Sequence, residues 1–335
     1  MGWSQNGLTQ LTSDVTYLAD DKLEGREIGT KGEELAAIFI AERYAEIGLT
    51  PKGTDGYFQT FSRKQEQDPH STAAADTGRV VGRNVAGFID NGAKTTVVIG
   101  AHYDHLGYGS HGSLHSGEPA IHNGADDNAS GIAVMLMLAE KLKSDAKSNN
   151  YLFIAFSGEE RGLWGSNYFT KEPTLKLDDV NYMINMDMVG RLNEENTLAI
   201  NGTGTSPIWK SLLPELNKSE FKLVLSESGV GPSDHTSFYL KDIPVLHFFT
   251  GQHDDYHKPS DDVDKVNFDG MHKIGGFIFS LITNLDDGGK IKFTKTKEPD
   301  ASSSPRFSVT LGVVPDYLFD GAGMRISGVK EGRTA

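Results

Sequence analysis

The sequence predicts an α/β fold in which a doubly wound mixed sheet is flanked by helices and followed by a short β-rich C-terminal tail. Short apolar runs alternate with segments of helical periodicity between residues 96 and 285, a pattern typical of this fold class. Several of these runs are followed by histidine or acidic residues, and open α/β sheets bind ligands at that edge. The 335 residues can bury one large core, or one core and a small module.

The first elements of the chain are predicted to be mostly helical, over residues 8–49. Gly48 follows the last apolar residue as a stop signal, and residues 23–30 form a loop within this segment. Residues 62–78 are polar and small, which predicts an exposed connection. The apolar residues that share one face of the predicted helix are Ala36, Ile40, Tyr44 and Ile47.

The central part of the chain supplies the strands and helices of the predicted sheet. The first two strands are joined by a turn-rich link at residues 90–93. Strands are predicted at 85–89, 95–100, 151–156, 182–186, 197–200 and 244–249. Helices are predicted at 130–142, near 207–216, and around the stripe of Ile274, Ile278, Leu281, Ile282 and Leu285.

The chain changes character after residue 289, so we expect a main domain over residues 1–289. Residues 290–305 are charged and Ser-rich, which predicts a linker. Residues 306–335 resemble the opening strands of a PDZ domain, a module that binds peptide termini by strand addition. They are too few for a whole module, so we predict an incomplete PDZ-like segment.

The composition excludes several classes of partner. A formal charge of −14 disfavours nucleic acids and anionic membranes, which require a basic face. No run approaches 18 apolar residues, so we expect no membrane span. The first ten residues have neither a basic nor an apolar stretch, so no signal peptide is expected in this chain. The absence of cysteine leaves only His, Asp and Glu as metal ligands.

Five short motifs with metal-binding chemistry follow one another at predicted strand exits and helix starts. Any one of them is weak evidence, because a lone buried histidine is usually a hydrogen-bonded structural residue and adjacent glutamates commonly begin a helix. Their conjunction favours a hydrolytic zinc site, because zinc accepts imidazole nitrogen and carboxylate oxygen. The motifs are His-x-Asp at 102–104, Gly-Ala-Asp-Asp-Asn at 124–128, Ser-Gly-Glu-Glu at 157–160, Asn-Met-Asp at 185–187 and Tyr-His-Lys-Pro-Ser-Asp at 256–261.

With these motifs the chain resembles the co-catalytic di-zinc aminopeptidases of metallopeptidase family twenty-eight, which have a zinc exopeptidase (phosphorylase/hydrolase-like) fold. The resemblance covers about residues 8–287 and includes LEGREIGTKGEELAA at 23–37. It implies two Zn²⁺ ions per chain. The implied zinc ligands are His102 and Asp187 for one ion, Glu160 and His257 for the other, and Asp127 as a bridge between them.

The resemblance also implies roles for residues around the ligands. Glu159 resembles the general base that takes a proton from water. Asp104 resembles the carboxylate that orients His102, and Asp261 is expected to do the same for His257.

Other polar residues near these motifs have less specific interpretations. Asp126 is expected to cap a helix, and Tyr256 and His253 are candidate donors to an oxyanion. Through the resemblance, Asp234 and His235 are expected to line the substrate site. Four further histidines lie in a Gly/Ser-rich loop, which favours a mobile rim over metal binding; they are His105, His111, His115 and His122.

The preferred interpretation is a zinc-dependent aminopeptidase that acts on peptides with a free N-terminus, located by resemblance outside the cytoplasm, secreted or periplasmic. A carboxypeptidase or dipeptidase of the same fold remains an alternative and would need a basic clamp for a substrate carboxylate. A glutaminyl cyclase is disfavoured by the five-ligand set. A non-catalytic peptide-binding module, with the PDZ-like segment as its functional part, is the alternative from another class.

Overall fold

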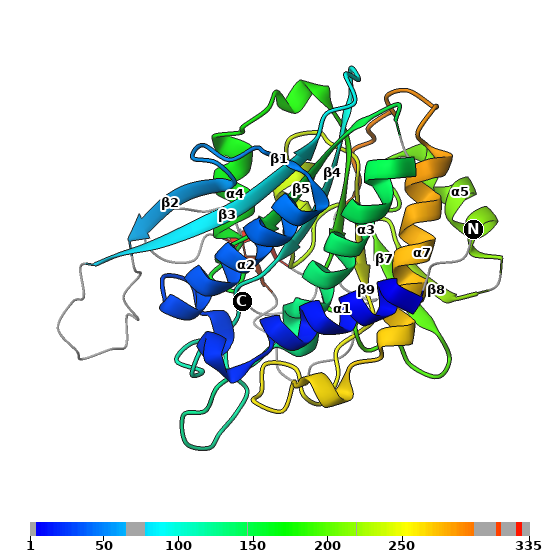
Figure 1. Ribbon diagram of the computed structural model, residues 1–335. Helices are drawn as coiled ribbons and strands as arrows, with labels where there is room; N and C mark the ends of the chain where they lie inside the picture. Colours follow the sequence, from blue (N-terminus) through cyan, green and yellow to red (C-terminus); the bar gives the residue numbers. More distant parts are fainter. Residues whose placement is uncertain are drawn as a thin grey trace.

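The computed structural model describes residues 5–64, 78–145, 147–218, 220–297, 313–315 and 326–329. Its centre is a nine-stranded mixed sheet in the order β1-β3-β5-β4-β6-β9-β7-β8, with β2 paired to β3, which confirms the predicted fold class (Figure 1). The strands are β1 (Thr50–Pro51), β2 (Phe58–Lys64), β3 (Arg79–Ile89), β4 (Thr96–His102), β5 (Asn150–Phe156), β6 (Val180–Met186), β7 (Thr197–Asn201), β8 (Lys222–Ser226) and β9 (Val245–Phe249).

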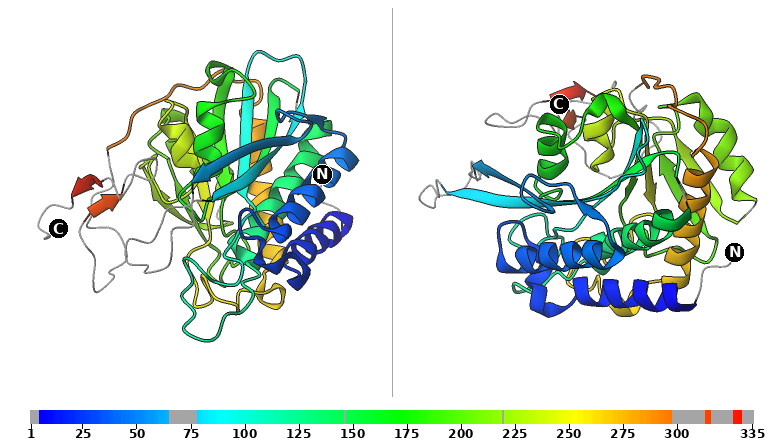
Figure 2. Two further views of the ribbon diagram at one scale, coloured as in Figure 1. Left: turned by 90° about the vertical axis from the view of Figure 1, so that its left-hand side faces the viewer. Right: turned by 45° about the horizontal axis from the view of Figure 1, so that its top comes forward.

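Helices cover both faces of the sheet (Figure 2). Side chains alternate along β4, so Val97 and Ile99 join the larger core cluster while Val98 joins the smaller one on the opposite face. The larger cluster includes residues from α1 (Gln5–Leu18), α2 (Lys31–Ile47), α3 (Gly131–Asp145), α5 (Pro207–Asn217) and α7 (Phe268–Asn284). The smaller cluster includes residues from α4 (Trp164–Lys171) and α6 (His235–Tyr239).

Helix α2 shows why the predicted N-terminal helices form. The Thr30 side chain accepts a hydrogen bond from the Glu33 N–H at the helix start, and Gly48 ends the helix in a left-handed conformation at φ 81°. Three of the four predicted stripe residues are fully buried in the larger core, and Ile47 is partly buried against it. The predicted loop at 23–30 differs, because its first half belongs to the short 3₁₀ helix η1 (Asp21–Arg26).

The order of the strands places the ends of β4, β5, β6 and β9 together. Strand β4 pairs in parallel with both β5 and β6, and β6 pairs in parallel with β9. The chain passes from β4 through α3 to β5 on one side, and later reaches β6 on the other side of β4. The strands joined by the link at 90–93, β3 and β4, are therefore not neighbours, because β5 lies between them. The switch in direction at β4 creates a ligand-binding edge.

The structure describes parts of two predicted connections. Residues 62–64 belong to β2, which pairs with β3, and residues 65–77 of that connection lie outside the described residues. The start of the predicted linker contacts the main body, since Ile291 N donates to Asn181 Oδ1 at 2.8 Å and Thr294 N to Thr205 O at 2.8 Å.

The described part of the PDZ-like segment is a pair of antiparallel strands, β10 (Val313–Pro315) and β11 (Ile326–Val329). The rest of residues 298–335 lies outside the described residues, so the three-part domain division stays a prediction. Across the parts of the chain that the structure describes, no helix is long and apolar enough to cross a membrane.

Candidate metal centre

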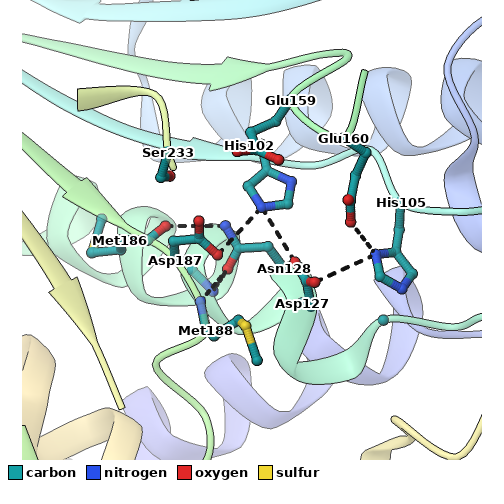
Figure 3. A network of polar contacts seen from close by, with 12 residues as sticks. His102, His105, Asp127, Asn128, Glu159, Glu160, Met186, Asp187, Met188 and Ser233 are labelled. Atoms are coloured by element: carbon teal, nitrogen blue, oxygen red, sulfur yellow. Dashed lines mark hydrogen bonds and ion pairs between the residues drawn. The ribbon is translucent and has the colours of Figure 1, made fainter. Parts of the chain in front are cut away.

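Three predicted ligands converge where β4 and β6 end. His102 is the last residue of β4, and Asp187 directly follows β6. The Nε2 atom of His102 lies 3.3 Å from Asp127 Oδ1 and 3.4 Å from Asp187 Oδ1 (Figure 3). The ligand atoms of these three residues lie within 4.8 Å of one another, a grouping that could hold a metal ion.

A second group of ligand atoms forms on the other side of Asp127. Glu160 follows β5, and its Oε2 atom lies 3.2 Å from His257 Nε2. The same His257 nitrogen is 3.4 Å from Asp127 Oδ2. Asp127 therefore turns one carboxylate oxygen toward His102 and the other toward His257, as expected of a bridging ligand. Burial alone would raise the pKa of Glu160, but hydrogen bonds from histidines lower it to about 2.

Glu159 stands beside the first group and contributes no atom to either of the groups that could hold a metal. It lines the same cavity as His102 and Asp187. Burial raises the pKa of the Glu159 carboxyl well above its usual range, and the charges of Asp187 and Glu160 raise it further. A carboxyl group with a raised pKa is suited to accept and release a proton.

Asp127 is held by an irregular helical turn, Ala125–Ser130, that precedes α3. The Oδ2 atom of Asp261 accepts hydrogen bonds from the backbone N–H groups of Asp126 and Asp127, both at 3.0 Å. The predicted role of Asp261 differs from these contacts, since His257 Nδ1 lies 2.8 Å from the Gly112 carbonyl oxygen instead. Asp261 thus supports the bridging residue, because its loop returns to the start of this turn.

Asp126 does not cap α3 as the sequence suggested. Its Oδ1 atom accepts from Gly190 N at 2.6 Å, and its Oδ2 atom lies 3.1 Å from His253 Nε2. These contacts join the turn to the segment after β6 and to the loop after β9. His253 is therefore committed to Asp126, which leaves Tyr256 as the candidate donor at the site.

Asp104 is buried behind the centre, and its contacts differ from the predicted role of its carboxylate. Its Oδ1 atom accepts from Glu159 N at 3.0 Å and its Oδ2 atom from Glu160 N at 3.4 Å. His102 Nδ1 lies 3.2 Å from the Asp104 main-chain carbonyl oxygen and 3.8 Å from Asp104 Oδ1 of the side chain. The main chain of Asp104 thus orients His102, while its carboxylate positions the loop that carries Glu159 and Glu160.

A cavity of about 150 Å³ opens beside the first group of ligands. Tyr256 lines it, and the Tyr256 ring stacks on His257 with centroids 3.8 Å apart. Besides Tyr256, Glu159 and the predicted zinc ligands, the lining consists of Met188, Asn201, Pro232, His247, Phe249 and Gln252.

Asp234 and His235, expected from the resemblance to line the substrate site, do not line this cavity. Both are fully buried at the start of α6. The His235 ring stacks on His247 at 4.5 Å between centroids, so it lies behind a lining residue rather than in the wall itself. Their position follows from α6, which packs against the sheet and turns these side chains toward the interior.

His105 was predicted to belong to the loop rim, and the structure corrects this. The ring is fully buried, and His105 Nδ1 lies 2.8 Å from Glu160 Oε1 (Figure 3). The signal that could have identified it is its place directly after Asp104, the last residue of the first motif, and three residues after His102. His122 is also buried, but its ring nitrogens contact Ala120 O and Ser113 Oγ.

Arg26 is a residue whose role the sequence analysis did not recognise. It is fully buried, and its guanidinium donates to the carbonyl oxygens of Tyr103 at 2.7 Å, Asn123 at 2.6 Å and Gly124 at 3.0 Å, and also to that of Leu18. These carbonyls belong to the end of α1, to the loop that begins directly after His102, and to the loop that leads to Asp127. A buried guanidinium is thus the shared donor for both ligand loops.

We expect Arg26→Met to lower the free energy of unfolding by at least about 3 kcal/mol, because each buried carbonyl left without a donor costs about 1–3 kcal/mol. Denaturant unfolding in the presence of a chelator measures this without a contribution from metal binding. Arg79→Met is the matched control, since among the described residues the exposed Arg79 side chain hydrogen-bonds only to Ser62, and a change within about 0.5 kcal/mol is expected there. Equal losses in both variants would contradict the role given to Arg26.

The donor set fits divalent cations. Two groups of three residues could hold a metal ion and share Asp127: His102 and Asp187 complete the first, and His105 and Glu160 complete the second. Their ligand atoms are all imidazole nitrogens or carboxylate oxygens, and His257 Nε2 lies beside the second group, 3.2 Å from Glu160 Oε2. Such atoms suit zinc and similar metals. Several buried carboxylates this close together are costly unless cations compensate their charge. The buried cation Arg26 donates its hydrogen bonds to carbonyl oxygens rather than to these carboxylates. The site is thus chemically complete for metal ions.

This fold and donor set define a class: an α/β protein with a site for divalent cations at the switch point of its sheet. The chain belongs to Peptidase family M28, whose profile matches residues 84–282. Among curated proteins, it is 29% identical to the aminopeptidase YwaD of Bacillus subtilis over 223 residues, which are 63% of this chain and 46% of that protein. The chain spans about half the length of the curated relatives it matches.

Solved structures share the fold at low sequence identity. A zinc aminopeptidase from Bacillus subtilis, BSAP, aligns with a TM-score of 0.64 and 18% identity over 85% of this chain and 95% of that chain. The glutaminyl cyclase of Porphyromonas gingivalis aligns with a TM-score of 0.66 and 16% identity over 83% of this chain and 98% of that chain. Because both activities occur on this fold, the choice between them depends on the site.

Proposed function

We propose that the protein is a zinc-dependent aminopeptidase that removes the N-terminal residue from peptides. The observation that carries this proposal is the pair of ligand groups sharing Asp127, with Glu159 beside them in the same cavity. The name of the relative YwaD and the description of BSAP support the same activity.

Two zinc ions are proposed per chain, with Asp127 bridging them. His102 and Asp187 would hold one ion, and Glu160 and His257 the other. Bound zinc supplies Lewis-acid polarisation of the scissile carbonyl and lowers the pKa of a water molecule. The residues of both ion positions line the cavity, so substrate in the cavity would have direct access to the metal ions, as a catalytic site requires.

The side chains around the ligands perform the remaining tasks. Glu159 accepts a proton from water and delivers it to the departing amine. The Asp104 carboxylate accepts hydrogen bonds from the backbone N–H groups of Glu159 and Glu160. These bonds keep the proposed base and its neighbour Glu160 at a fixed separation. Tyr256 lines the cavity with its ring against His257, and its proposed role is to donate a hydrogen bond from its hydroxyl to the developing oxyanion.

The lining of the cavity favours an aminopeptidase over a carboxypeptidase or dipeptidase. A free substrate carboxylate needs a basic partner, and among the described residues that line this cavity there is no lysine or arginine. Acidic side chains line it instead, and they attract the positively charged N-terminus of a peptide. Peptides with a free N-terminus are thus the proposed substrates.

The test combines elemental analysis with assays on one zinc-loaded sample. We expect two zinc ions per chain, and release of the first residue from an aminoacyl chromogenic substrate but not from its N-acetylated form. Hydrolysis of N-blocked dipeptides with a free carboxylate would replace the proposal with the carboxypeptidase alternative. Cyclisation of N-terminal glutamine without hydrolysis would replace it with a cyclase, and an absence of bound zinc would favour the peptide-binding module.

We also propose that the protein works outside the cytoplasm, in the periplasm or in secreted form. The description of a similar structure from Bacteroides thetaiotaomicron as a leucine aminopeptidase precursor supports this location. Fractionation of the source cells with an antibody to the chain tests it, and recovery in the cytoplasm alone would reject it.

A further inference from the structure

His105 occupies a position at the centre for which the proposed function provides no role. Its Nδ1 atom lies 2.8 Å from Glu160 Oε1 and 3.9 Å from Asp127 Oδ2. The other oxygen of Glu160, Oε2, lies 3.2 Å from His257 Nε2. The two oxygens of Glu160 therefore have different histidine partners.

The ring of His105 has a fixed place. Its backbone N–H donates to the Arg26 carbonyl oxygen at 3.3 Å, and its ring packs on Gly124, where an added Cβ would come within 2.6 Å of His105 Cδ2. The Nε2 atom is buried and has no hydrogen-bond partner among the described residues. Glu160 is thus the nearest partner that orients this ring.

The direction of this hydrogen bond follows from the chemistry of its two ends. An ionised carboxylate only accepts, so the Nδ1–H of His105 donates to Glu160 Oε1. Hydrogen bonds to carboxylates are short and strong, and the second oxygens of ligating carboxylates are commonly fixed by such donors. This bond restrains rotation of the Glu160 carboxylate and keeps its Oε2 facing His257.

We propose that His105 is a positioning residue for the metal position formed by Glu160, Asp127 and His257. The ligand atoms of His105, Asp127 and Glu160 lie within 4.8 Å of one another, a grouping that could itself hold a metal ion. Because His105 Nδ1 lies nearest to Glu160 Oε1, at 2.8 Å, we assign it to Glu160 as a donor rather than to the metal as a ligand. The proposal rests on the proposed function, because it assumes that zinc binds at this centre. It predicts that His105 affects one of the two zinc affinities and leaves the other nearly unchanged.

The test measures both zinc affinities of the full chain by competition with a chromogenic chelator, without reference to activity. His105→Ala is expected to weaken one zinc by about 10–100-fold, the usual effect of removing such a donor, and to change the other by less than about threefold. His105→Asn should restore most of the lost affinity, because its amide lies near the former Nδ1. His105→Gln should not, because its amide lies near the former Nε2.

His122→Ala is the matched control for loss of a buried histidine from the same loop, because the ring nitrogens of His122 contact neither Glu160 nor Asp127. Both of its zinc affinities should equal those of the unmodified protein. Far-ultraviolet circular dichroism checks folding, and the Asn and Gln pair carries the comparison if the alanine variant does not fold.

The outcomes separate this inference from the proposed function. If the unmodified chain binds no zinc, both fail. If it binds two zinc ions and His105→Ala weakens neither, or weakens both equally, only the role of His105 is overturned. If His105→Asn is as weak as His105→Ala, His105 does not act as a donor through Nδ1, and the positioning role is overturned.

Discussion

Glu159→Gln is expected to lower kcat by about 10²–10⁴-fold, the range typical of a lost general base, while both zinc ions stay bound. Glutamine has nearly the same shape but cannot accept the proton. Glu159 lines the cavity without joining either ligand group, so metal content should not change. Steady-state kinetics and elemental analysis on the same preparation measure both quantities.

Glu160→Gln is the informative comparison, because it changes the adjacent residue in the same way. Its Oε2 faces His257, so this variant should lose zinc as well as turnover. If Glu159→Gln kept full turnover, Glu159 would have no part in the mechanism. If it lost zinc in parallel with Glu160→Gln, Glu159 would be a ligand rather than a base.

Asp127→Ala is expected to lose both zinc ions together and to lower turnover by at least about 10²-fold, because metal ions supply several kcal/mol of charge stabilisation. The reason is the position of its carboxylate, with Oδ1 3.3 Å from His102 Nε2 and Oδ2 3.4 Å from His257 Nε2. Zinc titration with a competing chelator measures the loss at each site.

Asp126→Asn is the matched control for the neighbouring buried carboxylate. The oxygens of Asp126 contact Gly190 N, Ser130 Oγ and His253 Nε2 rather than the ligand groups. We expect this variant to be less stable but to retain two zinc ions. Full occupancy of one zinc site in Asp127→Ala would disprove the bridge.

Much of the fold could be predicted because its signals are local. The helical stripe that contains Ile274 and Ile278 became α7, and the apolar run at 182–186 became most of β6. Strands β2 and β8 lacked a clear pattern. Strand β8 lies at the sheet edge with Val224 and Leu225 exposed, so burial imposed no alternation on it.

The residues that converge at the candidate site could also be named from the sequence, since each ends or follows an apolar strand, or lies at a helix start, within a short motif. Their neighbours were harder to assign. Asp104 bonds to the N–H groups of residues 55 and 56 positions away, and Asp261 to those of residues 134 and 135 positions away. A short motif contains no information about contacts at such separations.

By itself, the sequence determined the fold class, the family and the residues that approach the metal centre, because hydrophobic periodicity and strand-end motifs are properties of neighbouring residues. Tertiary structure alone decided that β5 lies between β3 and β4, that His105 faces Glu160, and that Arg26 joins the two ligand loops. The physical reason is that a hydrogen bond requires its atoms to lie about 3 Å apart. Only the packing of distant segments brings them to that distance.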